Sequence, residues 1–146
     1  MYNIRRVFLD YVGYDDAWFE NVEIPLFDSQ KKEIESSIIS LTNGGGKTTL
    51  LSLIFSCFIP DKRYFVQHLQ KPHHKFEDYF KEPPGLILIE LNRPTGENEI
   101  ADDYPWVIGQ YVSVHQESLE DDRTYFAFKS SKKLSFDDVP YVSQRD

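Results

Sequence analysis

Residues 36–51 read SSIISLTNGGGKTTLL, and this stretch decides which fold the chain is expected to adopt. The apolar run at 36–41 has the length of a buried β-strand, and three glycines and a Lys-Thr-Thr sequence follow it. Leucine, isoleucine and phenylalanine then cover most faces of residues 50–58, and Pro60 cannot continue a helix. The pattern predicts a strand, a glycine-rich loop and a helix that is buried on nearly all sides.

A strand, a glycine-rich loop ending in Lys-Thr and a helix are the parts of a phosphate-binding P-loop. Glycines allow bare backbone N–H groups to approach phosphate oxygens, and the helix N-terminus adds partial positive charge. Lys47 would reach the β and γ phosphates, and the Thr48 hydroxyl would bind Mg²⁺. The residues predicted to bind Mg-ATP are Asn43, Gly44, Gly45, Gly46, Lys47, Thr48 and Thr49.

One position departs from the full pattern G-x-x-x-x-G-K-[ST], whose first glycine falls where this chain has Leu41. Asn43 tolerates left-handed backbone geometry and can take over part of the turn. We therefore expect Leu41 to pack into the core beneath the loop. The alternative interpretation of the whole stretch is a glycine turn between strand and helix with an incidental lysine.

The rest of the chain predicts mainly strands. With 146 residues and 17.2 kDa, the chain has room for one domain. Two or three antiparallel strands are expected over 3–27, a short helix near 76–80, and an antiparallel meander over 85–130. Together with the P-loop unit at 36–60, this indicates an α/β fold with a mixed sheet, a meander and one buried helix.

Net charge, cysteine content and the length of apolar runs exclude several classes of protein. The net charge is -8 and the pI near 5.0, which does not favour nucleic-acid binding by the overall field of the chain. A single cysteine, Cys57, excludes an internal disulfide, and no apolar run reaches the roughly 18 residues of a membrane span. The N-terminus has no apolar stretch of signal-peptide length, so a cytoplasmic protein without membrane contact is expected.

The sequence also resembles a known family. NGGGKTT at 43–49, after N-terminal strands and before FIPD at 58–61, resembles the N-terminal half of the ATPase head of SMC-like proteins. This family includes chromosome-maintenance ATPases, the bacterial condensin MukB with its plasmid-defence relatives, and repair ATPases. Its Walker A motif commonly reads N-G-x-G-K-[ST], and MukB-like members have a similar Ile-Pro-Asp after the helix. Residues 36–61 carry the specific part of the resemblance, and Leu41 departs from the usual glycine.

The resemblance implies that residues 1–146 are the N-terminal lobe of an ABC-type P-loop ATPase head. The coiled coil and the C-terminal lobe, which carries the signature motif, Walker B and the catalytic glutamate, would lie outside this chain. The implied function is an ATP-binding half-head that acts on DNA in chromosome organisation, repair or anti-plasmid defence. ATP hydrolysis would belong to the full-length protein, with no catalytic residue in this chain. The implied partners are the C-terminal half-head, a second head in a homodimer, DNA through the full assembly, and kleisin-like accessory subunits.

The family resemblance makes several further residues candidates for contact with nucleotide or DNA, because of their positions in the chain. Heads of this family contact nucleotide from their first strands, and Arg63 falls where they place an arginine loop that contacts nucleotide or DNA. The alternative for each residue is an ordinary strand, core or solvated position. LILIE at 86–90 resembles Walker B but ends in Glu90 instead of Asp, so we expect a meander residue there. The first-strand candidates are Arg5, Arg6, Tyr14 and Trp18.

Two glutamines and three histidines are further candidates for metal binding. Gln110 and Gln144 invite comparison with the Mg²⁺-binding glutamine of the family, but one lies mid-strand and the other in a polar tail. His68, His73 and His74 do not have the spacing of zinc ligands with one another or with Cys57. A solvated loop is the expected setting for these histidines. Basic and aromatic residues over 62–81 are a weak DNA-contact candidate, diluted by acids. The alternative functions are a small free-standing P-loop kinase or GTPase, or a non-catalytic interaction module.

Overall fold

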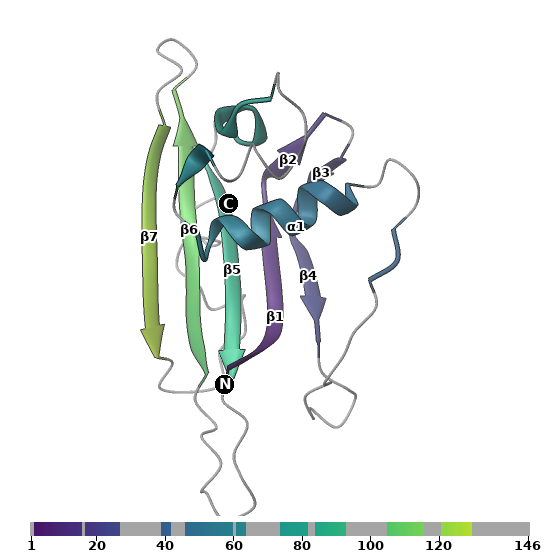
Figure 1. The fold of residues 1–146 in the computed structure, drawn as a ribbon, viewed down its shortest axis with the longest axis vertical. Helices are drawn as coiled ribbons and strands as arrows, with labels where there is room; N and C mark the ends of the chain where they lie inside the picture. Colours follow the sequence, from purple (N-terminus) through teal and green to yellow (C-terminus); the bar gives the residue numbers. More distant parts are fainter. Residues whose placement is uncertain are drawn as a thin grey trace, which may run out of the picture.

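The structure is a computed structural model. It describes residues 2–15, 17–26, 39–41, 46–59, 61–63, 74–81, 84–92, 105–115 and 121–129. The strands are β1 (Asn3–Asp10), β2 (Val12–Tyr14), β3 (Ala17–Phe19), β4 (Val22–Pro25), β5 (Gly85–Asn92), β6 (Trp106–Val114) and β7 (Asp121–Lys129). The helices are α1 (Lys47–Ser56) and the short 3-10 helix η1 (Phe76–Tyr79). The described part of the chain is therefore α/β, as predicted (Figure 1).

Five strands form the main sheet in the order β4-β1-β5-β6-β7, and β2 and β3 form a separate hairpin. The neighbours β5, β6 and β7 follow one another in sequence, so the meander predicted over 85–130 is confirmed. Every pairing among the described strands is antiparallel, so the mixed sheet that we predicted is not found in this part of the chain.

Two predictions about the N-terminal region need correction. The segment over 3–27 contains four strands instead of two or three, because the short hairpin β2–β3 interrupts it between β1 and β4. The strand predicted at 36–41 is wrong for residues 39–41, which lie outside any strand, and residues 36–38 are outside the described part. Apolar character had suggested a buried strand, but residues 39 and 40 are exposed.

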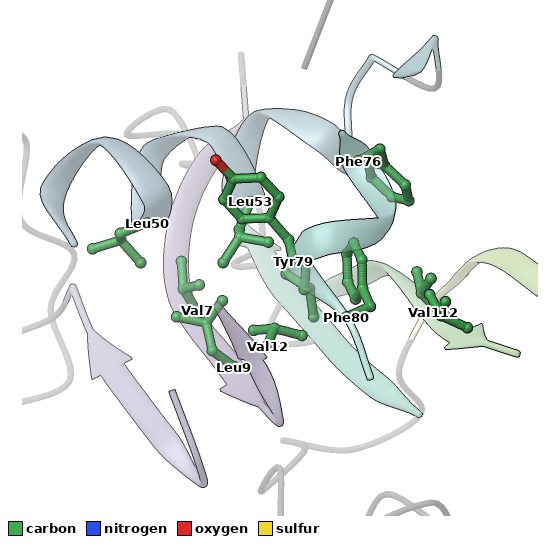
Figure 2. Packing of buried hydrophobic residues seen from close by; sticks show 11 residues of the cluster. Val7, Leu9, Val12, Leu50, Leu53, Phe76, Tyr79, Phe80 and Val112 are labelled. Atoms are coloured by element: carbon green, nitrogen blue, oxygen red, sulfur yellow. The ribbon is translucent and has the colours of Figure 1, made fainter. Parts of the chain in front are cut away.

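The main core lies between α1 and one face of the sheet. Figure 1 shows α1 crossing this face at an angle to β1 and β5. Leu50 and Leu53 of α1 are buried and point toward the strands, where Val7 and Leu9 of β1 meet them (Figure 2). Because strand side chains alternate between faces, Val7 and Leu9 share the side that α1 covers. Aromatic residues from η1 and the next residue complete this layer; they are Phe76, Tyr79 and Phe80.

The outer face of α1 is exposed, which contradicts the prediction of a helix buried on nearly all sides. Leu51 is 54% exposed and Phe55 is 55% exposed, and their spacing of four places both on one side of the helix. Phe58 and Ile59, just beyond the helix, are also exposed. The sheet covers only one side of α1, so the described residues leave an apolar stripe on the other; we call Leu51, Phe55, Phe58 and Ile59 the outer stripe.

The opposite face of the sheet holds a buried ionic cluster. A register shift between Ile4 and Arg6 makes Arg5 a bulge residue, and both arginines reach Glu90 of β5. Arg6 donates through Nε at 2.8 Å and Nη2 at 2.6 Å to Glu90 Oε2. Glu90 Oε1 lies 3.1 Å from Arg5 Nη1 without hydrogen-bond alignment, and Arg6 also meets the half-exposed Glu23 at 3.2 Å. Glu90 is fully buried, so two cations compensate its desolvation.

We predict that Glu90→Gln destabilises the protein by about 3 kcal/mol, because it leaves buried arginine charge without its carboxylate. The matched control is Glu23→Gln, which removes the exposed carboxylate that Arg6 also contacts and should cost less than about 1 kcal/mol. Urea denaturation of the three proteins measures both effects. Equal losses for the two variants would contradict the assigned role of the buried cluster.

Candidate functional site

The candidate site is built on the first turn of α1. Gly46 precedes the helix with φ 83° and ψ 27°, a left-handed conformation that favours glycine, and its carbonyl accepts a 2.7 Å hydrogen bond from Leu50 N–H. Lys47 and Thr48 follow and are exposed, whereas Thr49 is buried. The local geometry therefore turns the chain sharply into the helix and leaves the ammonium and hydroxyl groups of Lys47 and Thr48 at the surface.

The charge at this end of α1 is uncompensated by its own first turn. The Gly46 N-cap position has no side-chain capping bond, and the first turn contains no acidic residue. The first N–H groups of any helix lack intrahelical acceptors and carry partial positive charge. Together with the Lys47 ammonium, they can attract an anion with several oxygen acceptors.

The hairpin β2–β3 fixes the position of Gly46. A Cβ atom at Gly46 would lie 2.7 Å from the Ala17 Cβ and 3.3 Å from the Phe19 Cζ. The residue must therefore be glycine for two reasons, its left-handed φ and the close approach of β3. Leu41 packs against the main core, as predicted. Asn43, Gly44 and Gly45, the other predicted phosphate-binding residues, lie outside the described part of the chain.

The other end of α1 carries a polar network that the sequence analysis missed. Gln110 of β6 is fully buried and donates to the Ser56 hydroxyl, which in turn donates to the Leu53 carbonyl at 2.6 Å. Arg123 of β7 donates to Gln110 Oε1 at 3.3 Å and to the Tyr125 hydroxyl. An arginine among aromatic residues in a strand was the available signal. A cation near the last helical carbonyls is favourable, so the network holds this end of α1.

Gln110 lies at the opposite end of α1 from the candidate site. The ten residues of α1 span about 15 Å at 1.5 Å per residue, and Gln110 contacts the last of them while Lys47 is the first. Gln110 therefore acts on the helix and is not brought to the loop. Burial raises the pKa of the nearby Cys57 thiol to about 12, so this cysteine stays protonated near neutral pH and is not an activated nucleophile.

The first-strand candidates lie apart from Lys47 or are engaged elsewhere. Arg5 and Arg6 bind Glu90 on the sheet face opposite α1. Trp18 contacts Tyr11 edge to face at 5.2 Å between ring centroids, and the Lys81 ammonium lies 4.3 Å from its ring.

Tyr14 is the first-strand candidate that the hairpin connects most directly to the loop. It pairs across the hairpin with Ala17, the residue that contacts Gly46. Its ring stacks on His74 at 4.0 Å, and the hydroxyl of the neighbouring Tyr79 lies 2.9 Å from His74 Nδ1. Burial raises the pKa of Tyr79 to about 12, so its hydroxyl keeps its proton near neutral pH and shares a hydrogen bond with His74 Nδ1. One face of Tyr14 is thus already occupied.

The remaining candidates give no second site. Arg63 forms an ion pair with Asp61, two positions earlier in the chain, in which Arg63 Nη2 lies 2.8 Å from Asp61 Oδ2. The Arg63 side chain is exposed. The Arg63 hydrogen bond lowers the pKa of Asp61, and the same pair raises that of Arg63. His68, His73 and Gln144 lie outside the described residues. In the described ranges, no group of three or more histidine, cysteine or acidic residues could hold a metal ion.

Comparisons with protein-family models, with curated proteins and with solved structures found no match to this chain. Among the helices that the structure describes, none is long and apolar enough to cross a membrane. The functional assignment therefore depends on the site at the start of α1 and on the motif that forms it.

We predict that Gly46→Ala destabilises the protein by about 2 kcal/mol, because alanine must adopt a left-handed φ and its methyl meets Ala17. Adding Ala17→Gly should recover part of the loss in the double variant, since it removes the methyl contact but not the backbone strain. Thermal unfolding of the single and double variants measures the two contributions. A Gly46→Ala protein as stable as the wild type would refute the close approach of the hairpin.

Proposed function

We propose that this chain binds the phosphates of Mg-ATP through a Walker A loop and is the N-terminal half of an SMC-like ATPase head. The observation that carries the proposal is the left-handed Gly46 followed by exposed Lys47 and Thr48 at the start of a helix that is packed on a sheet. A glycine turn with an incidental lysine explains the turn. It does not explain why a lysine and a threonine directly follow the left-handed glycine at the positively polarised end of α1, where the first turn has no acid and no side-chain cap.

Each residue would have a separate task. Lys47 would neutralise the β and γ phosphates, and the backbone amides at the start of α1 would donate to phosphate oxygens. Thr48 would hold Mg²⁺ through its hydroxyl, and the ion would neutralise charge between the same two phosphates. A single exposed threonine hydroxyl fits a magnesium ion whose other ligands would be water and phosphate oxygens; the Lys47 ammonium would bind phosphate and not the metal.

Hydrolysis would require residues from another lobe. Phosphoryl transfer needs an acid for the Mg²⁺ shell and a residue that orients water. Glu90, which ends the apolar run LILIE, is bound to two arginines on the far face of the sheet, and Gln110 holds the opposite end of α1. The outer stripe of α1 supports a partner lobe, because contiguous exposed apolar residues often mark an interaction surface.

In the complete protein, ATP would bridge two heads of a homodimer, and the assembly would act on DNA in chromosome organisation, repair or anti-plasmid defence. These steps, like any kleisin-like subunit, derive from the family resemblance. A self-sufficient P-loop kinase or GTPase remains the alternative enzyme, and the two proposals differ in whether this chain alone turns over nucleotide.

We predict that Lys47→Ala abolishes measurable Mg-ATP binding in isothermal titration, while the melting temperature changes little because Lys47 is exposed. Thr48→Ala should leave weak ATP binding that no longer strengthens with Mg²⁺. Lys129→Ala, at an exposed lysine of β7, is the matched control and should bind as the wild type. If folded Lys47→Ala protein bound ATP with unchanged affinity, the loop would be a turn without a role in phosphate binding, and the proposal would be wrong.

We further predict that the chain alone releases no phosphate from ATP, and that the C-terminal half-head added in trans restores turnover. A double variant, Leu51→Ser with Phe55→Ser, should weaken this complementation at least tenfold with little change in stability, because both side chains are more than half exposed. Tyr2→Ser, at an exposed aromatic residue away from α1, is the control. Robust turnover by the chain alone, lost in Lys47→Ala, would instead favour the kinase or GTPase alternative.

A further inference from the structure

The hairpin β2–β3 is an insertion between two strands that pair directly with each other. Leu9 of β1 lies opposite Val22 of β4, and the residues of the hairpin leave the main sheet between them. The Asn21 N–H donates to Asp10 Oδ1 at 2.9 Å across the base of the hairpin. The hairpin therefore extends from the end of the β1–β4 pair, and Figure 1 shows it beside α1.

Each connection of this hairpin contains a non-glycine residue in the left-handed region. The φ angle is 58° at Tyr11 before β2, 50° at Asp15 between the strands and 49° at Asn21 after β3, and the described residues hold no other non-glycine residue with positive φ. Aspartate and asparagine tolerate this conformation, whereas a bulky tyrosine rarely adopts it. Such strain persists where the surroundings hold the backbone in place, and it is often found beside functional sites.

An aromatic stack holds the turn end of the hairpin against η1. The Tyr14 ring stacks on His74 with 4.0 Å between centroids and 21° between planes. It also lies 5.1 Å from the ring of the buried Tyr79, whose hydroxyl is hydrogen-bonded to His74 Nδ1 at 2.9 Å. A two-stranded hairpin is marginally stable by itself, and all residues of β3 are only half-buried. The stack therefore supplies contacts that the hairpin needs to keep its position.

The same end of the hairpin contacts the residue that begins α1. Ala17 pairs with Tyr14, and its Cβ lies only 2.7 Å from the place where a Cβ at Gly46 would stand. The Gly46 carbonyl accepts the 2.7 Å hydrogen bond from Leu50 N–H. A shift of the hairpin would therefore release Gly46 and change the orientation of the amides at the start of the helix.

We propose that Tyr14 and His74 are positioning residues of the phosphate site. Their stack, tied to η1 through Tyr79, keeps the hairpin against Gly46 and holds the first amides of α1 in the binding geometry before the phosphates arrive. This role rests on the proposed function, because it acts on the same site. An anion held by several backbone amides binds more tightly when those amides are already ordered, since less conformational freedom is lost on binding. His74 covers one face of Tyr14, and the ring acts through Ala17 and Gly46.

The test combines calorimetric titration with Mg-ATP and amide hydrogen exchange of the protein without nucleotide. Tyr14→Ala should weaken ATP binding about tenfold and speed the exchange of the Leu50 amide, which reports on the bond to Gly46. Tyr14→Phe keeps the stacked ring and should bind as the wild type does. His74→Ala removes the same stack from a residue outside the strands, so it provides the test if Tyr14→Ala does not fold.

Val107→Ala is the control for a general loss of stability, because Val107 is buried on the face of the sheet opposite α1. It should lower the melting temperature and leave ATP affinity unchanged. Wild-type affinity in the folded alanine variants of Tyr14 and His74 would overturn the positioning role and leave the Walker A proposal standing. Equal weakening in Val107→Ala, or faster Leu50 exchange without weaker binding, would overturn it too. A wild-type protein that does not bind Mg-ATP would overturn the proposed function and this role together.

Discussion

The burial of Leu50 and Leu53 against the sheet is the interaction on which the rest of the structure depends. These two leucines cover Val7 and Leu9 of β1 and hold α1 across the sheet (Figure 2). Burying such side chains contributes roughly 1.5–3 kcal/mol each, far more than any single surface contact of the helix. Because the side of α1 that faces the sheet is thereby fixed, the direction in which its two ends point is fixed as well.

The two ends of α1 differ in whether their backbone polar groups have side-chain partners. At the end of the helix, Gln110 and Ser56 form a buried hydrogen-bond chain that continues to Arg123, so the helical carbonyls have local partners. At the start, Gly46 permits a sharp turn, and the first turn has neither an acid nor a side-chain cap. A helix that is anchored at one end and electrostatically open at the other is suited to holding an anion without moving. This asymmetry is the physical basis of the proposed phosphate site.

The sequence predicted what local chemistry controls. The meander followed from alternation and turn residues, and the helix start followed from Gly46 and Lys47. Burial was harder to predict, because apolar content cannot say how many sides of a helix a neighbour covers; Phe55 is exposed although it is apolar. The Gln110 network was missed because its members are far apart in sequence and are brought together only by the register of β6 and β7. Residues 39–41 are apolar in part but have no pairing partner in the described sheet, so local apolar character predicted a strand that the described residues do not form.

The central claim is that phosphate oxygens bind at the start of α1, and backbone amide NMR of the nitrogen-15-labelled chain tests it most directly. Mg-ATP and adenosine are titrated separately, so that the phosphates are the difference between the two ligands. The account predicts large shifts of the Gly46, Lys47 and Thr48 amide signals with Mg-ATP and none with adenosine. Equal shifts with both ligands, or no shift at these three amides while the protein stays folded, would contradict it.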